Sequence, residues 1–346
     1  MPLRLSPALS LLALACCLQP SPGAASPEPR PGAAATDARG WLARIHAAAE
    51  TGNYQGTLVF STGGTLSSSR VSHYAVGDQT FERLEALDGR QQRVLRHNDT
   101  VQTVWPQSRV AVIEKRETIA AGSTTPQAVD PQALEQYEFR REGEGRVAGR
   151  GAAVFMLEPR DLLRYAQRLW ADLVTGLMLR ADVIGQASAV SGGARPVLES
   201  TAFSEVLIGV KPPPDVANQT LLHARQLEGY RVVRPQQQRT SLDAEGWVLA
   251  NPVPGFRLAG CVRRGMVDKA SEEEPVLQAV FSDGLTHVSL FVEDFKPQRH
   301  RAEGSTQFGA TSTLIQRHGE HWLTVVGDVP AATLKLFAAA LERRRP

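Results

Sequence analysis

The sequence predicts a mixed α/β (α+β), β-rich protein with a large curved antiparallel sheet and a smaller C-terminal α/β domain. From residue 53 to residue 158, apolar and polar residues alternate in short segments separated by turns that contain glycine and aspartate. Many short strands at such close spacing are typical of a curved or closed antiparallel sheet. A second series of alternating segments follows a polar stretch and ends in one apolar helical segment. For a chain of 346 residues, these observations indicate two domains.

The first 25 residues have the composition of a secretory signal peptide. Arg4 supplies a positive charge, the apolar run 5–18 follows, and small residues end the segment. We expect cleavage after Ala25, with Ala35 as the second candidate site. The mature protein is therefore expected to be exported, and no other apolar run is long enough to cross a membrane as a helix.

The cysteines and the net charge narrow the classes of function. Acylation of Cys16, as in a lipoprotein, is an alternative that is disfavoured because Leu14 stands where a small residue is expected. Removing the signal takes away Cys16 and Cys17, so Cys261 is left alone and no intramolecular disulfide can form. It also takes one arginine from the 38 Lys and Arg, which leaves 37 basic against 36 acidic residues. A charge so close to zero gives no drive toward nucleic acid.

The N-terminal domain, expected over residues 37–210, begins with a helix and continues as strands. Trp41, Ile45 and Ala49 stand at helical spacing after a Pro/Ala-rich tail, and Gly52 is placed to end this helix. The strands that follow are expected at residues 53–62, 67–76, 79–87, 91–97, 100–105, 109–115, 136–141, 145–149 and 152–158.

The segment "RYAQRLWADLVTGLMLRADVIG" fits two descriptions. Its leucines can be drawn on one face of a helix, but its second half alternates strictly, with Leu177, Leu179 and Val183 on one parity. We favour a hairpin with a turn at Leu173 to Gly176. The segment "PVLESTAFSEVLIG" is then expected to continue the sheet as another strand.

Residues 211–246 are proline-rich and polar, which predicts a linker region between the domains. The C-terminal domain, expected over residues 247–346, is predicted as a five-stranded sheet with one closing helix. Its strands are expected in "GFRLAGCVRR", "PVLQAVFSDG", "THVSLFVEDF", "GATSTLIQRHG" and "HWLTVVGD". The helix is "PAATLKLFAAALERR", with Pro330 at its first position, Asp328 as a nearby cap and a basic last turn.

No motif in the chain predicts catalysis, so we expect a protein that is not an enzyme and has no cofactor. There is no H-E-x-x-H, G-x-S-x-G, phosphate-binding loop or dinucleotide fingerprint. His318 and His321 are close in sequence, but no cysteine or third histidine accompanies them. Exposed turn histidines are the better interpretation, and no metal is expected.

The alternating segments instead predict an apolar groove. A single helix cannot cover the concave face of a sheet of nine or more strands, and the uncovered part would suit a lipid or a peptide. Ordinary core packing is the alternative for each residue. The candidate groove residues are Leu58, Phe60, Phe81, Leu84, Trp105, Phe155, Leu169 and Leu179, with Val104, Val112 and Leu157 on the same face.

Long stretches of the chain resemble one protein family. The run "NYQGTLVFSTGG", the following "SRVSHYAVGDQTFERLEALDGRQQRVLRHNDTVQTVWP" and "YAQRLWADLVTGLMLRADVI" are similar to the MucB/RseB family of periplasmic sigma-E regulators. "FSDGLTHVSLFVEDF" and "GATSTLIQRHGEHWLTVVGDVPAATLKLFAAAL" match the family pattern near the end of the chain. The likeness is diffuse but covers nearly the whole mature chain in order.

The resemblance implies a fold, a location and a partner. The N-terminal domain would resemble the lipoprotein carriers LolA and LolB, and a smaller α/β domain would follow it. The protein would bind the periplasmic part of an anti-sigma factor of the RseA/MucA type and shield it from proteolysis. Amphiphilic lipid or lipopolysaccharide would relieve that grip. The oligomeric state is left open, a homo-oligomer included.

Two basic residues are candidate partner contacts, and two other functions are alternatives to the regulator. Arg263 and Arg264 are candidate contacts to an acidic peptide or a phosphate. The rivals are a periplasmic lipoprotein or lipid carrier, which would not need the C-terminal domain, and an exported hydrolase, for which no nucleophile is found. A charged residue at Leu58 or Phe60 is expected to abolish the lipid response before it abolishes binding of the anti-sigma factor.

Overall fold

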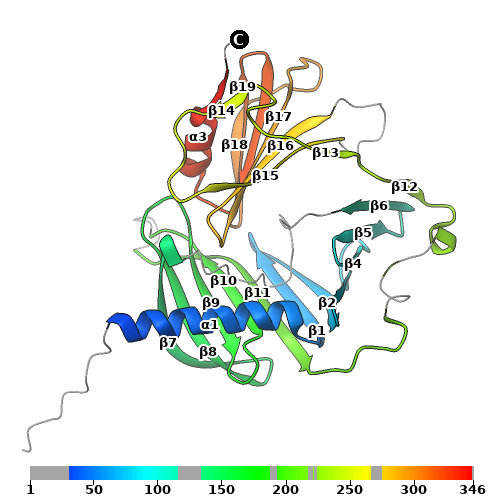
Figure 1. Cartoon of the computed structure of the whole chain (residues 1–346), viewed down its shortest axis with the longest axis vertical. Helices are drawn as coiled ribbons and strands as arrows, with labels where there is room; N and C mark the ends of the chain where they lie inside the picture. Colours follow the sequence, from blue (N-terminus) through cyan, green and yellow to red (C-terminus); the bar gives the residue numbers. More distant parts are fainter. Residues whose placement is uncertain are drawn as a thin grey trace, which may run out of the picture.

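The computed structural model of the chain contains two large sheets, which Figure 1 shows one above the other. We call the 12-stranded sheet the N-terminal sheet and the seven-stranded one the C-terminal sheet. The signal peptide and the cleavage site after Ala25 lie outside the described residues. Among the residues that the structure describes, no helix combines the length and apolarity needed to span a membrane. The structure describes residues 31–115, 134–187, 193–216, 221, 224–265 and 275–344.

The N-terminal sheet has the order β12-β6-β5-β4-β3-β2-β1-β11-β10-β9-β8-β7 and is antiparallel except for the β12–β6 pair. The predicted hairpin is confirmed and consists of β9 and β10. The two strands expected at residues 136–141 and 145–149 form one strand, β7, with a bulge between Arg141 and Gly143. The strands are β1 (Tyr54–Thr62), β2 (Thr65–Val76), β3 (Gln79–Ala86), β4 (Arg93–His97), β5 (Thr100–Trp105), β6 (Val110–Lys115), β7 (Tyr137–Val147), β8 (Arg150–Pro159), β9 (Ala166–Asp172), β10 (Met178–Ile184), β11 (Val197–Ile208) and β12 (Arg231–Val233).

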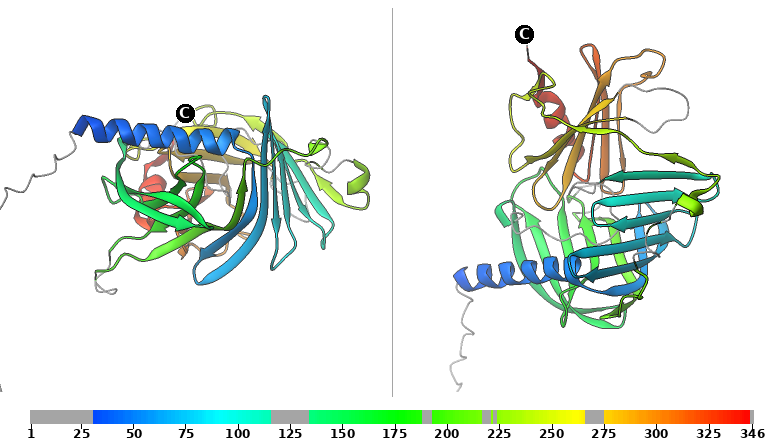
Figure 2. Two further views of the ribbon diagram at one scale, coloured as in Figure 1. Left: turned by 90° about the horizontal axis from the view of Figure 1, so that it is seen from below. Right: turned by 45° about the vertical axis from the view of Figure 1, so that its right-hand side comes forward.

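Helix α1 (Pro31–Thr51) begins before residue 37, earlier than predicted, and lies along one face of the sheet (Figure 2). Leu42 and Ile45 of this helix are fully buried against β7, β8, β9 and β10. Gly176, in the β9–β10 turn, has φ +82°, and a Cβ there would lie 3.0 Å from the carbonyl oxygen of Arg44. The turn therefore needs glycine to let the helix approach. We call the face that packs against α1 the inner face and the opposite face the outer face.

The polar stretch predicted as a linker lies against the outer face. Val210 and Val216 pack with Tyr74 and Phe81, and Leu227 packs with β5 and β6. A short 3-10 helix, η3 (Ala224–Leu227), precedes β12, which pairs in parallel with β6. Strand β13 (Gln237–Arg239) then pairs with the C-terminal sheet. The connection thus pairs with the N-terminal sheet through β12 and, a few residues later, with the C-terminal sheet through β13.

The C-terminal sheet has seven strands, so the predicted five-stranded sheet is wrong. The additional members are two edge strands, β13 and β18, which are short and fully exposed and therefore lack an apolar alternation to predict them. The order of the C-terminal sheet is β13-β15-β16-β17-β20-β19-β18. Besides β13, its strands are β15 (Arg257–Arg264), β16 (Val276–Ser282), β17 (His287–Asp294), β18 (Gly304–Phe308), β19 (Thr311–His318) and β20 (His321–Gly327).

The closing helix, α3 (Ala331–Ala340), differs from the prediction at both ends. Pro330 is its N-cap rather than its first residue, and no side chain caps it. The carboxylate of Asp328 instead accepts a hydrogen bond from Thr311 Oγ1 at 2.6 Å. No basic residue lies in the last turn, because the chain leaves the helix after Ala340 and forms β21 (Leu341–Arg343), which pairs with β14 (Trp247–Leu249). Leu334 and Phe337 of α3 are fully buried in the core of the C-terminal sheet.

Candidate binding surface and domain junction

Half of the predicted groove residues form the core beneath α1. Strand pairing places Leu58, Phe203, Leu179, Leu169 and Phe155 on the inner face of neighbouring strands. All of these side chains are buried, and they pack with the helix or with residues that contact it. Because α1 already covers them, Leu58, Phe155, Leu169 and Leu179 have no surface to offer a ligand.

Three of the predicted residues lie on the inner face where α1 does not cover it. Phe60, Leu84 and Trp105 are only half-buried and lie on the inner face of β1, β3 and β5. Val94 and Val112 share this face and are also half-buried, because Leu84 pairs with Val94, and both Val94 and Val112 pair with Thr103. We call these five apolar residues the β1–β6 surface. All five side chains remain partly exposed.

The expectation for Phe81 is wrong. It lies three residues before Leu84 on the same strand, and side chains an odd number of residues apart point to opposite faces. Phe81 therefore lies on the outer face, where it is buried against Tyr74 and Val216 and stacks on His97 with ring centroids 4.6 Å apart. Val104 is likewise on the outer face, under Leu227.

A polar row borders the β1–β6 surface. Tyr54, His73, Glu82 and Arg96 stand opposite one another on β1 to β4. His73 stacks on Tyr54, and its Nδ1 donates to the carbonyl oxygen of Gly52 at 2.6 Å. Burial, together with the nearby carboxylate of Glu82, raises the pKa of Tyr54. Tyr54 and His73 are buried, so Glu82 and Arg96 are the members of the row with exposed side-chain surface.

The predicted partner contacts Arg263 and Arg264 both bind carboxylates within the chain. Arg263 pairs with Glu245 at 2.6 Å, and that hydrogen bond holds the pKa of Glu245 below its ordinary value. Arg264 points to the other face of β15, where it lies 3.5 Å from Glu114 of β6 and donates to Gln278. The Arg264–Glu114 pair therefore joins the two sheets, and a partner that used either arginine would have to replace an existing carboxylate.

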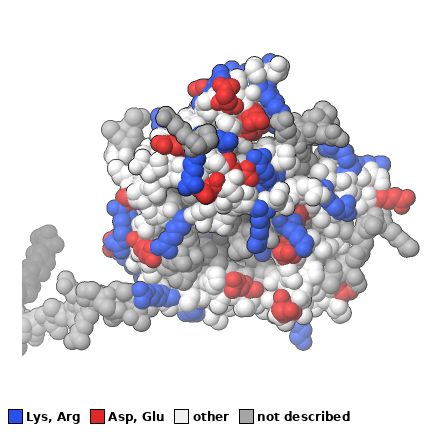
Figure 3. Space-filling model, turned by 45° about the horizontal axis from the view of Figure 1, so that its top comes forward, with Lys and Arg blue, Asp and Glu red and all other residues white. Residues whose placement is uncertain are grey.

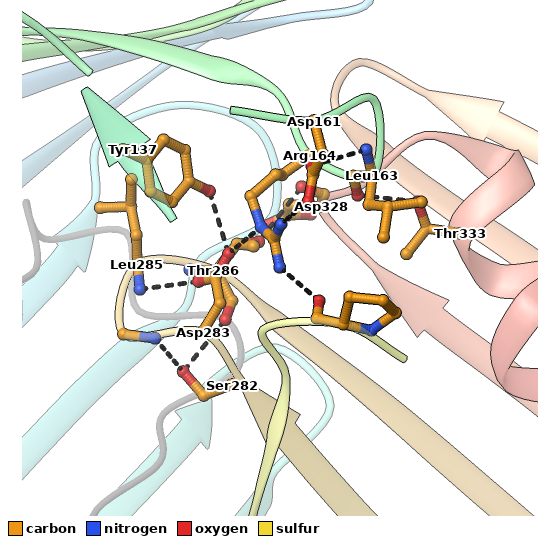
Figure 4. A network of polar contacts seen from close by, with 12 residues as sticks. Tyr137, Asp161, Leu163, Arg164, Ser282, Asp283, Leu285, Thr286, Asp328 and Thr333 are labelled. Carbon is orange, nitrogen blue, oxygen red and sulfur yellow. Dashed lines mark hydrogen bonds and ion pairs between the residues drawn. The ribbon is translucent and has the colours of Figure 1, made fainter. Parts of the chain in front are cut away.

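A second contact between the sheets is buried. Figure 4 shows Arg164, in the connection from β8 to β9, with its guanidinium among groups of the C-terminal sheet. Its Nε donates to Asp283 Oδ2 at 2.7 Å and its Nη2 to the carbonyl oxygen of Pro254 at 2.9 Å, and Asp161 is a further partner. Tyr137 Oη also donates to Asp283 Oδ2, at 3.1 Å. Burial, followed by the Asp283 charge, raises the pKa of Tyr137 well above its ordinary value.

Charged side chains of both signs lie on the face of the molecule shown in Figure 3, where Lys and Arg are interspersed with Asp and Glu. Arg257 of β15 contributes a pair with Glu135 at 2.8 Å, and both side chains are largely exposed. Arg264 and Glu114 lie deeper in the same junction. The junction therefore places ion pairs beside the apolar sheet surface.

Two kinds of reactive group can be checked in the described residues, a metal site and a reactive thiol. Within them, no group of three or more His, Cys, Asp or Glu is arranged to hold a metal ion. Burial, together with the charge of Glu245, raises the pKa of the Cys261 thiol to about 11, so it is not a nucleophile at neutral pH. The fold defines a class of proteins built from two large β-sheets joined by a polar connection.

Comparison with known proteins places the chain within that class. The sequence profile of the MucB/RseB N-terminal domain matches residues 37–222, and that of the MucB/RseB C-terminal domain matches residues 241–342. The chain belongs to the MucB/RseB family, and its β-rich mixed fold class is confirmed.

Individual relatives span nearly the whole chain. The sigma factor AlgU regulatory protein MucB of Pseudomonas aeruginosa is 29% identical over 316 residues, which cover 88% of this chain and 90% of that protein. The sigma-E factor regulatory protein RseB of Haemophilus influenzae is 25% identical over 303 residues, with the same two coverages. The solved MucA/MucB complex of Pseudomonas aeruginosa contains a chain with 27% identity and a TM-score of 0.65, matched over 90% of this chain and 100% of that one.

Sequence patterns did not indicate the buried junction. Arg164 and Asp283 are 119 residues apart, and each stands in a short segment between strands. Leu285 also belongs to such a turn. The only local signal is Asp161 three residues before Arg164, a spacing that is common on any polar loop.

Proposed function

We propose that this protein is a periplasmic negative regulator of the sigma-E envelope-stress response. It binds the periplasmic part of a MucA- or RseA-type anti-sigma factor and shields that segment from proteolysis. The observation that carries the proposal is the end-to-end likeness to MucB, which has been solved in complex with MucA. The absence of a catalytic motif in the sequence agrees with a protein that acts by binding alone.

The two domains bind different ligands. Residues 37–210 sense an amphiphile through the β1–β6 surface, and the connection 211–246 with residues 247–346 docks the anti-sigma segment. The docking site adjoins the junction, where Arg257 and Arg264 supply positive charge. A lipid that binds better to the free protein than to the complex then weakens the partner by the same factor.

A second candidate is a periplasmic carrier of lipids or lipoproteins. The half-buried Phe60, Leu84 and Trp105 favour it, because they would line an acyl-chain site. A carrier has no need of a second sheet, whereas a regulator that joins two ligands does. Both proposals place the protein in the periplasm after removal of residues 1–25.

Calorimetric titration with the periplasmic segment of the anti-sigma factor from the same organism tests the proposal. We expect saturable 1:1 binding by the delipidated mature protein, and protection of the segment from limited proteolysis. Lipid binding without any binding of the segment would favour the carrier. Binding of neither ligand would exclude both candidates.

A further inference from the structure

The two sheets are held together very differently on the two sides of their junction. On one side Arg164 and Asp283 are fully buried and bonded at 2.7 Å. On the other, Arg264 and Glu114 are 3.5 Å apart, with 27% and 9% of their side chains exposed, so this pair is longer and less fully buried. The Arg257–Glu135 pair on this side is largely in solvent. Water can replace the partners of exposed charges, but separating a buried pair leaves an uncompensated charge in the interior. The two sides therefore resist opening unequally.

Apolar side chains reinforce the buried side by crossing in both directions. Leu163, from the connection between β8 and β9, packs against the core of the C-terminal sheet. Leu285, from the turn between β16 and β17, packs against the core beneath α1. Thr333 of α3 donates its hydroxyl to the carbonyl oxygen of Leu163 at 2.7 Å. Each sheet thus contributes a leucine to the core of the other, and neither can withdraw without exposing it.

The backbone of the C-terminal domain also approaches Arg164 closely. Gly255 has φ +77°, and a Cβ there would lie 2.5 Å from Arg164 Nη2 and 2.4 Å from Gln136 Oε1. Arg164 also lies over the ring of Phe256, 4.7 Å from its centroid. The C-terminal sheet therefore closes around the guanidinium on several sides at once (Figure 4).

We propose that the Arg164 cluster, formed by Tyr137, Leu163, Arg164, Asp283 and Leu285, is a fixed pivot between the two sheets. Rotation about it opens and closes the side of the junction that holds Arg264 and Glu114. The short pairings of β12 and β13 on that side tether the sheets and limit the opening. Arg164 is thus a positioning residue for the binding surface, without touching a ligand itself.

Paired spin labels on the full mature chain measure this asymmetry. One pair, Lys115→Cys with Gln238→Cys, reports the opening side, and the other, Leu162→Cys with Leu336→Cys, reports the pivot side. All four positions are exposed, whereas Cys261 is buried with a raised pKa and serves as the unlabelled background. Glu114→Gln, which removes the ion pair, should broaden the distance distribution of the first pair and leave the second narrow. A second distribution that broadens as much as the first would overturn the pivot.

Variants of the pivot supply the converse test. Arg164→Met leaves Asp283 without its cation and should broaden the Leu162–Leu336 distribution. Adding Asp283→Asn to it removes the uncompensated charge and should narrow that distribution again. If Arg164→Met does not fold, Thr333→Val removes only the hydroxyl bond to Leu163 and should give a smaller broadening of the same pair. An unchanged distribution in every folded variant would contradict the proposal.

A third experiment adds a ligand and rests on the proposed function. Its outcomes distinguish a wrong proposed function from a wrong pivot. Adding the periplasmic anti-sigma segment should shift the Lys115–Gln238 distance and leave Leu162–Leu336 unchanged. A segment that binds and shifts the second pair contradicts the pivot. A segment that does not bind counts against the proposed function, while the ligand-free distances still decide the pivot.

Discussion

Glu199 lies on β11 where the turn between β18 and β19 meets the N-terminal sheet. Its Oε1 accepts hydrogen bonds from Thr62 Oγ1 at 3.1 Å and from the backbone N–H of Ala310 at 3.2 Å. Burial, followed by the charge of Asp328, raises the pKa of Glu199. A raised carboxyl pKa means that the stabilising contribution is complete below the ordinary value of 4.5 and is lost as the pH rises through the folded-state value. This contact between the sheets is therefore weaker at neutral than at acidic pH.

The substitution Glu199→Gln keeps the acceptor oxygen but removes the charge. We expect it to raise the Tm at pH 7 by a few degrees, since about 1 kcal/mol corresponds to about 2–4 °C in a chain of this size. The difference from the unsubstituted protein should disappear near pH 4, where the carboxyl is protonated. Thermal unfolding by circular dichroism at the two pH values measures this. Glu205→Gln, on an exposed position of the same strand, is the control, and a lower Tm for Glu199→Gln at pH 7 would disprove the account.

A substitution at Phe60 should change lipid binding without changing the stability of the fold. Because it is half-buried on the β1–β6 surface, Phe60→Asp should weaken binding of a monoacyl phospholipid about ten- to hundredfold and leave the fold intact. That range corresponds to about 1.5–3 kcal/mol for one buried phenyl group. Fluorescence titration measures the affinity, and far-UV circular dichroism checks the fold.

The matched control for Phe60 is Leu66→Asp. Leu66 lies on the neighbouring strand, on the outer face, and is 73% exposed, so its substitution should leave lipid affinity unchanged. Equal loss in both variants would mean that the β1–β6 surface is not the lipid site. The same experiment is not informative at Leu58, which is buried beneath α1, because a charge there would unfold the core.

At the scale of elements, the position of α1 depends on the β9–β10 turn. Gly176→Ala would combine an unfavourable positive φ with a Cβ 3.0 Å from the Arg44 carbonyl oxygen. We expect it to lower the free energy of unfolding by about 2–4 kcal/mol, measured by urea denaturation. Gly193→Ala separates the two causes, because Gly193 has a nearly equal φ of +84° but nothing within 4 Å of a Cβ. It should cost only about 1 kcal/mol, and equal losses would mean that the helix contact contributes nothing.

The strands of the N-terminal sheet were predictable because strand periodicity is local. Residues at β1 to β6 alternate in the sequence, and most of the turns between them carry glycine or aspartate, so element type could be read without tertiary information. Short exposed strands such as β13 and β18 have no buried side to produce alternation. Leu58 is core rather than a ligand contact because it lies in one cluster with Ala48 of α1, a contact that alternation along a single strand does not reveal.

At the scale of the whole molecule, the surface and the junction depend on register and on long-range contacts. Phe81 could not be assigned to a face without knowing which strands it pairs with, since a run of apolar residues does not fix its own partner. The connection 211–246 is polar because it covers a sheet from outside and crosses between sheets at the surface. Arg164 and Asp283 meet only after both domains are folded. The family resemblance supplied the partner, which no local pattern could.

The central claim is that one molecule couples two ligands, and a reciprocal titration tests it most directly. The dissociation constant of the anti-sigma segment is measured with and without a saturating monoacyl phospholipid, and that of the lipid with and without saturating segment. The account predicts that each ligand weakens the other by the same factor, about 5- to 150-fold. A segment affinity that does not change when the lipid site is full would contradict it.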